Sequence, residues 1–260
     1  MNEPLPRLSA NALTQYSFCE RRFALRYKAS RYWPAPEGGP EREGPNPLAL
    51  GSAFHQLVHQ RVLGLDLDGT LALRETELPE LGVLWRAFSQ SPHAVGANAR
   101  LWTEQALHFA IAGVPVEVRY DRLAEEDGRW TILDWKTGRV SAKIRGTWQT
   151  KLYRYALVEA GEALTGTPIA PEQVTLVYWE VPKGHAVAFP YDADEHAAIR
   201  AELEAIAGRV TAPFDDAPAD DANFKRNPDH CGQCPFDAYC NRAPLPLPAS
   251  AQRTLPRFIS

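Results

Sequence analysis

Residues 114–138 read VPVEVRYDRLAEEDGRWTILDWKTG, and this stretch predicts a β-hairpin around which the rest of the chain is arranged. Two extended runs flank Asp127-Gly128, a dipeptide typical of two-residue hairpin loops. With that loop, Asp121 faces Asp134, and two facing carboxylates destabilise a hairpin unless a cation lies between them. Lys136 points to the same face, because side chains two residues apart in a strand share a face. The hairpin therefore predicts a divalent-cation site.

The opposite face of the hairpin is predicted to be apolar. It would carry Val116, Val118, Tyr120, Leu133 and Trp135, which together form a credible core side. The charged side chains would then lie on one face of the hairpin and the apolar side chains on the other, because successive residues of a strand point to opposite faces. A longer loop would shift the register and remove this separation.

The whole chain has the composition of a globular protein and a formal charge of −4, so bulk charge does not draw it to nucleic acid. Its length suits one large domain or two small ones. No N-terminal leader pattern and no apolar run of membrane-spanning length stand out, which predicts a cytoplasmic protein without a membrane partner. A local basic run is present instead, and a solvated helix face would explain such a run equally well. It comprises Lys136, Arg139, Lys143, Arg145, Lys151 and Arg154.

Four cysteines lie far apart in the sequence: Cys19 near one end, and Cys231, Cys234 and Cys240 near the other. Persistent disulfides are uncommon in the cytosol, so this spacing favours metal ligation over buried structural thiols. Zinc and an iron-sulfur cluster both accept four thiolates, and spacing does not decide between them. His230 beside Cys231 leaves a mixed zinc site open.

The N-terminal part predicts helices. Ser9 is a plausible N-cap of a helix that extends to about Tyr27 with Cys19 on its buried stripe. Its other face carries Arg21, Arg22, Arg26, Lys28 and Arg31, which form either a solvated surface or a phosphate-binding rim. Residues 34–47 are rich in Pro and Gly and predict an exposed, mobile loop.

Residues 48–63 return to helical periodicity and carry His55 and His59, one helical turn apart. Two ordinary histidines explain this spacing better than a metal site does. Further helices are predicted at 81–90, 147–159 and 192–210, and strands at 101–111, 174–181 and 186–189. The helix at 147–159 places Gln149 and Tyr153 on one face. The pattern predicts a three-stranded meander within a mixed α/β sheet, followed by an extended Pro-rich tail at 243–260.

Taken in order, these motifs resemble the PD-(D/E)XK nuclease superfamily. The resemblance rests on Gly51-x3-His55, Asp121, Asp134-x-Lys136 and Gln149-x3-Tyr153, enclosed by one N-terminal and three C-terminal cysteines. Within this superfamily, the chain resembles more narrowly the RecB-type exonuclease branch that carries an iron-sulfur cluster. This branch includes the AddB nuclease domain and CRISPR-adaptation nucleases. The match covers nearly the whole chain.

The resemblance implies a fold and an activity. It implies a single restriction-endonuclease-like domain, residues 1–260, with a mixed central sheet flanked by helices and a catalytic core at 48–210. Segments 9–31 and 225–242 would be joined by a structural [4Fe-4S] cluster on Cys19, Cys231, Cys234 and Cys240. It further implies a DNA exonuclease acting on single strands or frayed ends, in repair, recombination or CRISPR-type processing, with a helicase or another repair protein as a partner. A catalytically silent module that binds DNA ends or partners, with zinc or iron-sulfur, is the alternative.

The resemblance also implies roles for single residues. His55, Asp121, Asp134 and the carbonyl of Trp135 would bind Mg²⁺ or Mn²⁺, and Lys136 would activate water and stabilise the developing charge. Gln149 and Tyr153 would contact DNA, as would Arg139, Lys143 and Arg145. The chain departs from the family pattern at Val118-Arg119-Tyr120, where Gly-Arg often precedes the strand acid. Glu104 is a weak candidate for an upstream acid of some family members.

Overall fold

The computed structural model describes residues 5–31, 47–91, 99–215, 217 and 222–241. The predicted tail at 243–260 and almost all of the predicted mobile loop at 34–47 lie outside these residues. Within the described ranges, no helix has the length and apolar character needed to cross a bilayer.

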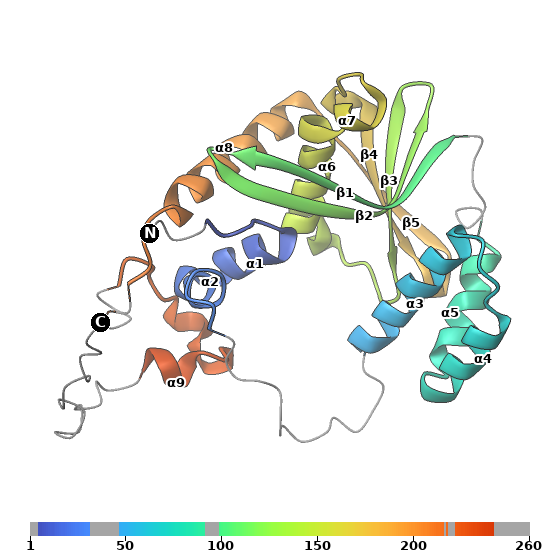
Figure 1. Cartoon of the computed structure of the whole chain (residues 1–260), viewed down its shortest axis with the longest axis horizontal. Helices are drawn as coiled ribbons and strands as arrows, with labels where there is room; N and C mark the ends of the chain where they lie inside the picture. The colour runs from blue at the N-terminus through green and yellow to red at the C-terminus, as the bar shows by residue number, and fades with distance from the viewer. Residues whose placement is uncertain (1–4, 32–46, 92–98, 216, 218–221, 242–260) are drawn as a thin grey trace, which may run out of the picture.

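A five-stranded mixed sheet forms the centre of the fold (Figure 1). Its strands lie in the order β1 (Arg100–Ile111), β2 (Val114–Glu126), β3 (Arg129–Lys136), β4 (Val174–Glu180) and β5 (His185–Pro190). Among these five strands, β3 and β4 pair in parallel, and the other neighbours pair antiparallel. The predicted meander and mixed sheet are confirmed.

The β2–β3 loop has the predicted two residues. Asp127 and Gly128 adopt positive φ angles of 50° and 76°, as a type I′ turn requires. Glu126 pairs with Arg129, and the ladder continues in that register as far as Arg122 and Leu133. The register deduced from the Asp-Gly loop is therefore confirmed over the residues that pair.

Helices cover both sides of the sheet (Figure 1). In chain order they are α1 (Ala10–Phe18), α2 (Glu20–Tyr27), α3 (Pro47–Val62), α4 (Asp68–Glu77), α5 (Glu80–Ser89), α6 (Trp148–Ala160), α7 (Glu162–Thr165), α8 (Ala193–Val210) and α9 (Asp237–Cys240). Short 3₁₀ turns are η1 (Ala142–Gly146), η2 (Pro171–Gln173), η3 (Val181–Lys183) and η4 (Pro228–Gln233). Side chains of α1, α6 and α8 pack in one core cluster, and those of α3 and α5 pack in a second.

The predicted single apolar face of the hairpin is wrong. Val116, Val118 and Tyr120 pack in the cluster with α6, whereas Leu133 and Trp135 pack in the cluster with α3 and α5. The reason is a local change of strand parity, because the odd-numbered Leu123 joins the even-numbered Val118 and Tyr120 in one cluster. Opposite this point in β1, Glu104 has a φ of 49°, a left-handed conformation unusual for a residue with a side chain.

Strands β2 and β3 separate after Arg122 and Leu133, which leaves a fork in the sheet. The paired residues end there, so Asp121 and Asp134 stand at the fork rather than within the ladder. The free edge of β2 beyond the fork is taken by the segment before α1, where Leu8 forms a parallel bridge with Val116. At the fork, Asp121 contacts His55 of α3 and Asp134 contacts Gln149 of α6, so the two carboxylates lie between these helices instead of within a regular hairpin.

The single helix predicted from Ser9 to Tyr27 is in fact two helices. Ser9 caps α1 as predicted, since its side chain accepts a hydrogen bond from the Ala12 amide. Cys19, however, has an extended backbone with φ −167° and ψ 119°, and it separates α1 from α2. Cys19 is buried as expected.

Arg21 does not lie on an exposed basic face, which corrects a second expectation for this region. It is only 2% exposed, and its guanidinium donates hydrogen bonds to the carbonyls of Asp215 and Ala217. Because these acceptors follow α8, Arg21 joins the N-terminal helices directly to the segment after α8. It is therefore a structural residue, and the remaining arginines of α2 must carry any phosphate contact from this side.

Candidate active site

Asp121 lies at the fork and is held from two sides. The backbone N–H of Trp135 donates to its Oδ2 at 3.0 Å, which ties β2 to β3 beyond the last ladder pair. His55 reaches it from α3, with Nδ1 at 3.3 Å from Oδ1 of Asp121. The predicted juxtaposition of His55 and Asp121 is therefore present, although the two come from elements far apart in the sequence.

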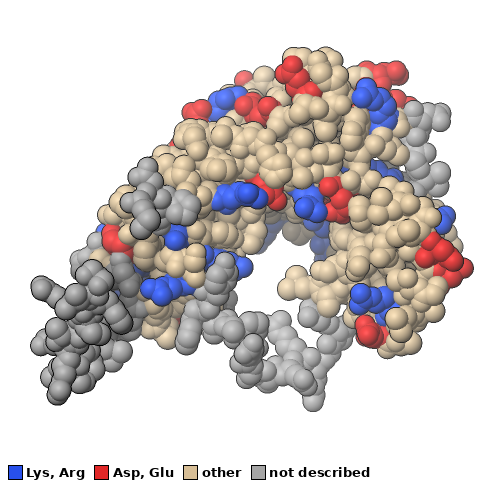
Figure 2. All heavy atoms as spheres, in the orientation of Figure 1, with Lys and Arg blue, Asp and Glu red and all other residues tan. Residues whose placement is uncertain are grey.

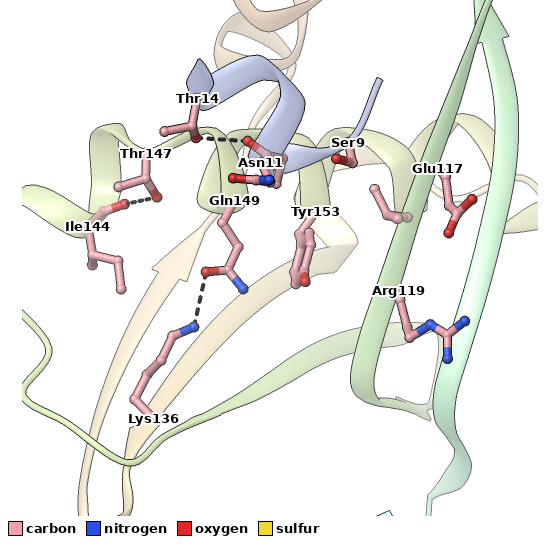
Figure 3. A pocket seen from close by; sticks show the side chains of 12 residues that line it. Ser9, Asn11, Thr14, Glu117, Arg119, Lys136, Ile144, Thr147, Gln149 and Tyr153 are labelled. Atoms are coloured by element: carbon pink, nitrogen blue, oxygen red, sulfur yellow. Dashed lines mark hydrogen bonds between the residues drawn. The ribbon is translucent and has the colours of Figure 1, made fainter. Parts of the chain in front are cut away.

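Asp134 is the buried member of the pair, at 2% exposure. Its Oδ1 accepts a hydrogen bond from Gln149 Nε2 at 2.7 Å, and its Oδ2 lies 2.7 Å from Lys136 Nζ. Lys136 in turn donates to Gln149 Oε1 at 3.0 Å, a contact that Figure 3 shows with both side chains pointing toward each other. Three residues predicted for the site thus form a closed triangle of contacts.

The site stores repulsion between its acids. Burial, followed by the nearby charge of Asp121, raises the pKa of Asp134 to about 7, although Lys136 and His55 act in the opposite direction. Burial lowers the pKa of His55, but its hydrogen bond to Asp121 and the charges of Asp121 and Asp134 outweigh burial and raise it. A cation between the carboxylates would relieve this repulsion.

The donor set suits a hard divalent cation, which prefers carboxylate oxygens. Asp134 Oδ2 is buried and, despite its ion pair with Lys136, makes no hydrogen bond of regular geometry. Even so, the described residues include no group of three or more His, Cys, Asp or Glu side chains already arranged around a metal position. In the arrangement seen, Lys136 and Gln149 occupy the oxygens of Asp134.

A cavity of about 670 Å³ opens beside Lys136 and Gln149. Tyr153 lines it one turn further along α6, so both predicted DNA-contacting residues of this helix face the same space (Figure 3). The opposite walls hold Ser9, which was expected only as a helix cap, and side chains that the sequence did not single out: Asn11 and Thr14 of α1, and Glu117 of β2. Side chains two residues apart in a strand share a face, so Arg119 and Glu117 lie on the same face of β2 as Asp121. This alternation could have identified them from the sequence as residues that line the cavity.

Residues at the departure from the family pattern also line this cavity. Val118 and Arg119 both line it, although the Val118 side chain packs in the core cluster with α6. Arg119 lies 3.8 Å from Glu104, which places this candidate upstream acid near the cavity but in an ion pair. His59, one turn from His55, has a buried Nδ1 without a hydrogen-bond partner in the described structure and makes no described contact with the site.

The predicted basic run divides into surface and buried members. Arg139, Lys143 and Arg145 are exposed on the segment that joins β3 to α6. Arg154 is wholly buried, and its guanidinium forms a bidentate ion pair with Glu195. It therefore has a structural role. Lys151 pairs with Glu202 on α8.

Lys and Arg side chains gather at the hollow in the molecular surface. Figure 2 shows the surface hollowed below the sheet, between the side carrying α1 and α2 and the side carrying α3 to α5. Basic side chains lie along the rim of this hollow. This location would allow them to bind an anionic backbone.

The four cysteines line one small cavity of about 10 Å³, and all of them are free thiols. Burial raises the pKa of Cys240, and so does the proximity of the other three. His230 lines the same cavity, but its Nδ1 is directed to the Phe18 carbonyl at 2.8 Å. The fold thus brings Cys19 together with Cys231, Cys234 and Cys240, although these described cysteines are not arranged as a ready metal site.

Comparison with known proteins places these observations in context. A family model described as the PD-(D/E)XK nuclease superfamily matches residues 7–241. A crystal structure of a protein from Eubacterium rectale, provisionally named an exonuclease, aligns over 100% of this chain and 92% of its own at 12% identity with a TM-score of 0.50, which supports the fold alone. The crystal structure of SSO0001 covers 75% of this chain and 96% of its own, at 13% identity and a TM-score of 0.33. No curated protein matches.

Proposed function

Because the chain belongs to the PD-(D/E)XK nuclease superfamily, we propose that it is a divalent-metal-dependent deoxyribonuclease that acts on single-stranded DNA or frayed ends. The observation that carries this proposal is the group of contacts among Asp134, Lys136 and Gln149 beside a large cavity. A site kept only for binding would have no need to bury a carboxylate against a second one. Electrostatic strain of this kind is typical of active sites.

In this proposal each site residue has a role that its contacts support. His55, Asp121 and Asp134, with the Trp135 carbonyl, would hold Mg²⁺ or Mn²⁺. Such an ion lowers the pKa of bound water and neutralises phosphate charge. Lys136 would orient the attacking water and stabilise the negative charge that develops on the phosphorane oxygens. Gln149 would hold the side chains of Lys136 and Asp134 in position, since its amide contacts both.

The substrate would run along the cavity and the basic segment before α6. Tyr153 faces the cavity, and Arg139, Lys143 and Arg145 are exposed nearby in the chain. Phosphate contacts of this kind give affinity without sequence preference. We propose that the protein acts in the cytoplasm, in DNA repair, recombination or CRISPR-type processing. A helicase would supply the single strands.

A cleavage assay tests the activity. Purified protein is incubated with single-stranded and double-stranded DNA labelled at either end, with Mg²⁺ or Mn²⁺, beside Asp134→Ala as the matched inactive variant. We expect metal-dependent shortening of single strands by the wild type alone. Equal products from both proteins would refute the nuclease proposal, and unchanged DNA binding without cleavage would support the binding-only alternative.

We also propose that Cys19, Cys231, Cys234 and Cys240 hold a structural [4Fe-4S] cluster. The four thiols surround one cavity, and a bridge between the two chain ends would stabilise the fold by restricting the unfolded chain. Visible absorption of anaerobically purified protein separates this proposal from zinc, which is colourless. A colourless protein with stoichiometric zinc would replace the cluster by the zinc alternative.

A further inference from the structure

Helix α1 extends between the cysteine cavity and the catalytic cavity. Its first turn and Thr14 line the catalytic cavity, whereas Phe18 and Cys19 at its other end line the cysteine cavity. Directly before Phe18, Ser17 Oγ accepts a hydrogen bond from the indole Nε1–H of Trp148 at 2.7 Å. We propose that this hydrogen bond is a positioning contact, which fixes the start of α6 and thereby couples the cysteine cavity to the catalytic site; this rests on the proposed nuclease function.

The α6 end of the contact explains its effect on the site. Trp148 is buried and is the first residue of α6, directly before Gln149. The first turn of a helix lacks part of its hydrogen bonding and frays most easily. Because one amide of Gln149 contacts both Asp134 and Lys136, a small rotation of this turn would disturb both contacts. The indole bond to Ser17 opposes that rotation.

The α1 end of the contact is itself held firmly. The Phe18 carbonyl accepts from His230 at 2.8 Å, and the Phe18 ring stacks on the His230 ring with centroids 4.0 Å apart. At the start of the helix, Leu8 N–H donates to the Pro115 carbonyl at 2.8 Å, which attaches the helix to β2. Phe18 lines the cysteine cavity and directly follows Ser17, so under this proposal a change at that cavity would displace the Ser17 hydroxyl.

Removal of one hydroxyl group tests the proposal. We expect Ser17→Ala to lower DNA-cleavage turnover and to weaken Mn²⁺ binding by roughly tenfold each, as loss of a contact that supports a metal site does, while unfolding stays cooperative. Ser17→Thr keeps the hydroxyl and should retain both. Trp148→Phe should show the same losses, and the double variant should lose no more than either single variant, because the two changes break the same bond. Ser89→Ala on α5, whose hydroxyl bonds only within its own helix, is the matched control.

The readouts separate this inference from the nuclease proposal. If the wild type cleaves no better than Asp134→Ala, the nuclease proposal fails, and Mn²⁺ affinity measured without DNA still decides the positioning role. Wild-type Mn²⁺ affinity in Ser17→Ala would overturn the coupling. Additive losses in the double variant would overturn it as well, since Ser17 and Trp148 would then act independently.

Discussion

Replacing Asp134 by asparagine should stabilise the metal-free protein at alkaline pH while removing activity. Asp134 is buried beside Asp121, and its pKa is raised from 3.8 to about 7 in the folded protein. Between these two values the unfolded chain has already released the proton that the folded chain retains. The free energy of unfolding therefore falls as the pH rises through this window, and the loss is complete above the folded pKa.

The size of the effect follows from the pKa difference. Each pKa unit corresponds to about 1.36 kcal/mol, so a rise from 3.8 to about 7 sets an upper limit of about 4 kcal/mol. Water admitted to the site relaxes part of this penalty, and we expect roughly 2 kcal/mol between pH 5 and pH 8. His55 acts in the same direction, because its pKa is also raised in the folded protein and its stabilisation is lost as the pH rises through that value.

Urea unfolding at pH 5, 6, 7 and 8 without divalent cations measures the difference between wild type and Asp134→Asn. The variant should gain stability relative to wild type as the pH rises. Asp194→Asn, an exposed change on α8 that removes the same charge, should give a profile parallel to wild type. Adding Mn²⁺ at pH 8 should stabilise wild type and leave Asp134→Asn unaffected. Parallel pH profiles for wild type and Asp134→Asn would refute the reasoning about stored repulsion.

Three further predictions concern the surrounding residues. Arg154→Met should lower the free energy of unfolding by about 2–3 kcal/mol in urea titrations because it removes charge-assisted hydrogen bonds to Glu195, which keeps Arg145 at 3.8 Å, whereas Lys151→Met, near the surface, should cost less than about 1 kcal/mol. His55→Ala should weaken Mn²⁺ binding by roughly tenfold in calorimetry, and unchanged affinity would remove it from the ligand set. Replacing the exposed Arg139 and Lys143 by Gln should reduce the salt dependence of DNA binding by about one ion per residue, and an unchanged salt slope would place the DNA elsewhere.

The hairpin register could be predicted because it depends on local chemistry. Asp127 and Gly128 accept the positive φ angles of a two-residue turn, and this turn sets every pair up to Arg122 and Leu133. The cap at Ser9 and the strand-helix order are local in the same sense. Periodicity and capping act within a few residues, so the sequence alone determines them.

The site required the tertiary structure, because its parts come from distant segments. Parity predicted one apolar face for the hairpin, but the fork beyond Arg122 divides that face between two cores. Basic composition marked Arg21 and Arg154 as surface charges, yet packing buries both against carbonyl or carboxylate partners from elsewhere in the chain. The sequence by itself determined the hairpin and the order of its charged residues. Which of those charges meet at the fork was decided only by long-range packing, since local propensity carries no information about partners from distant segments.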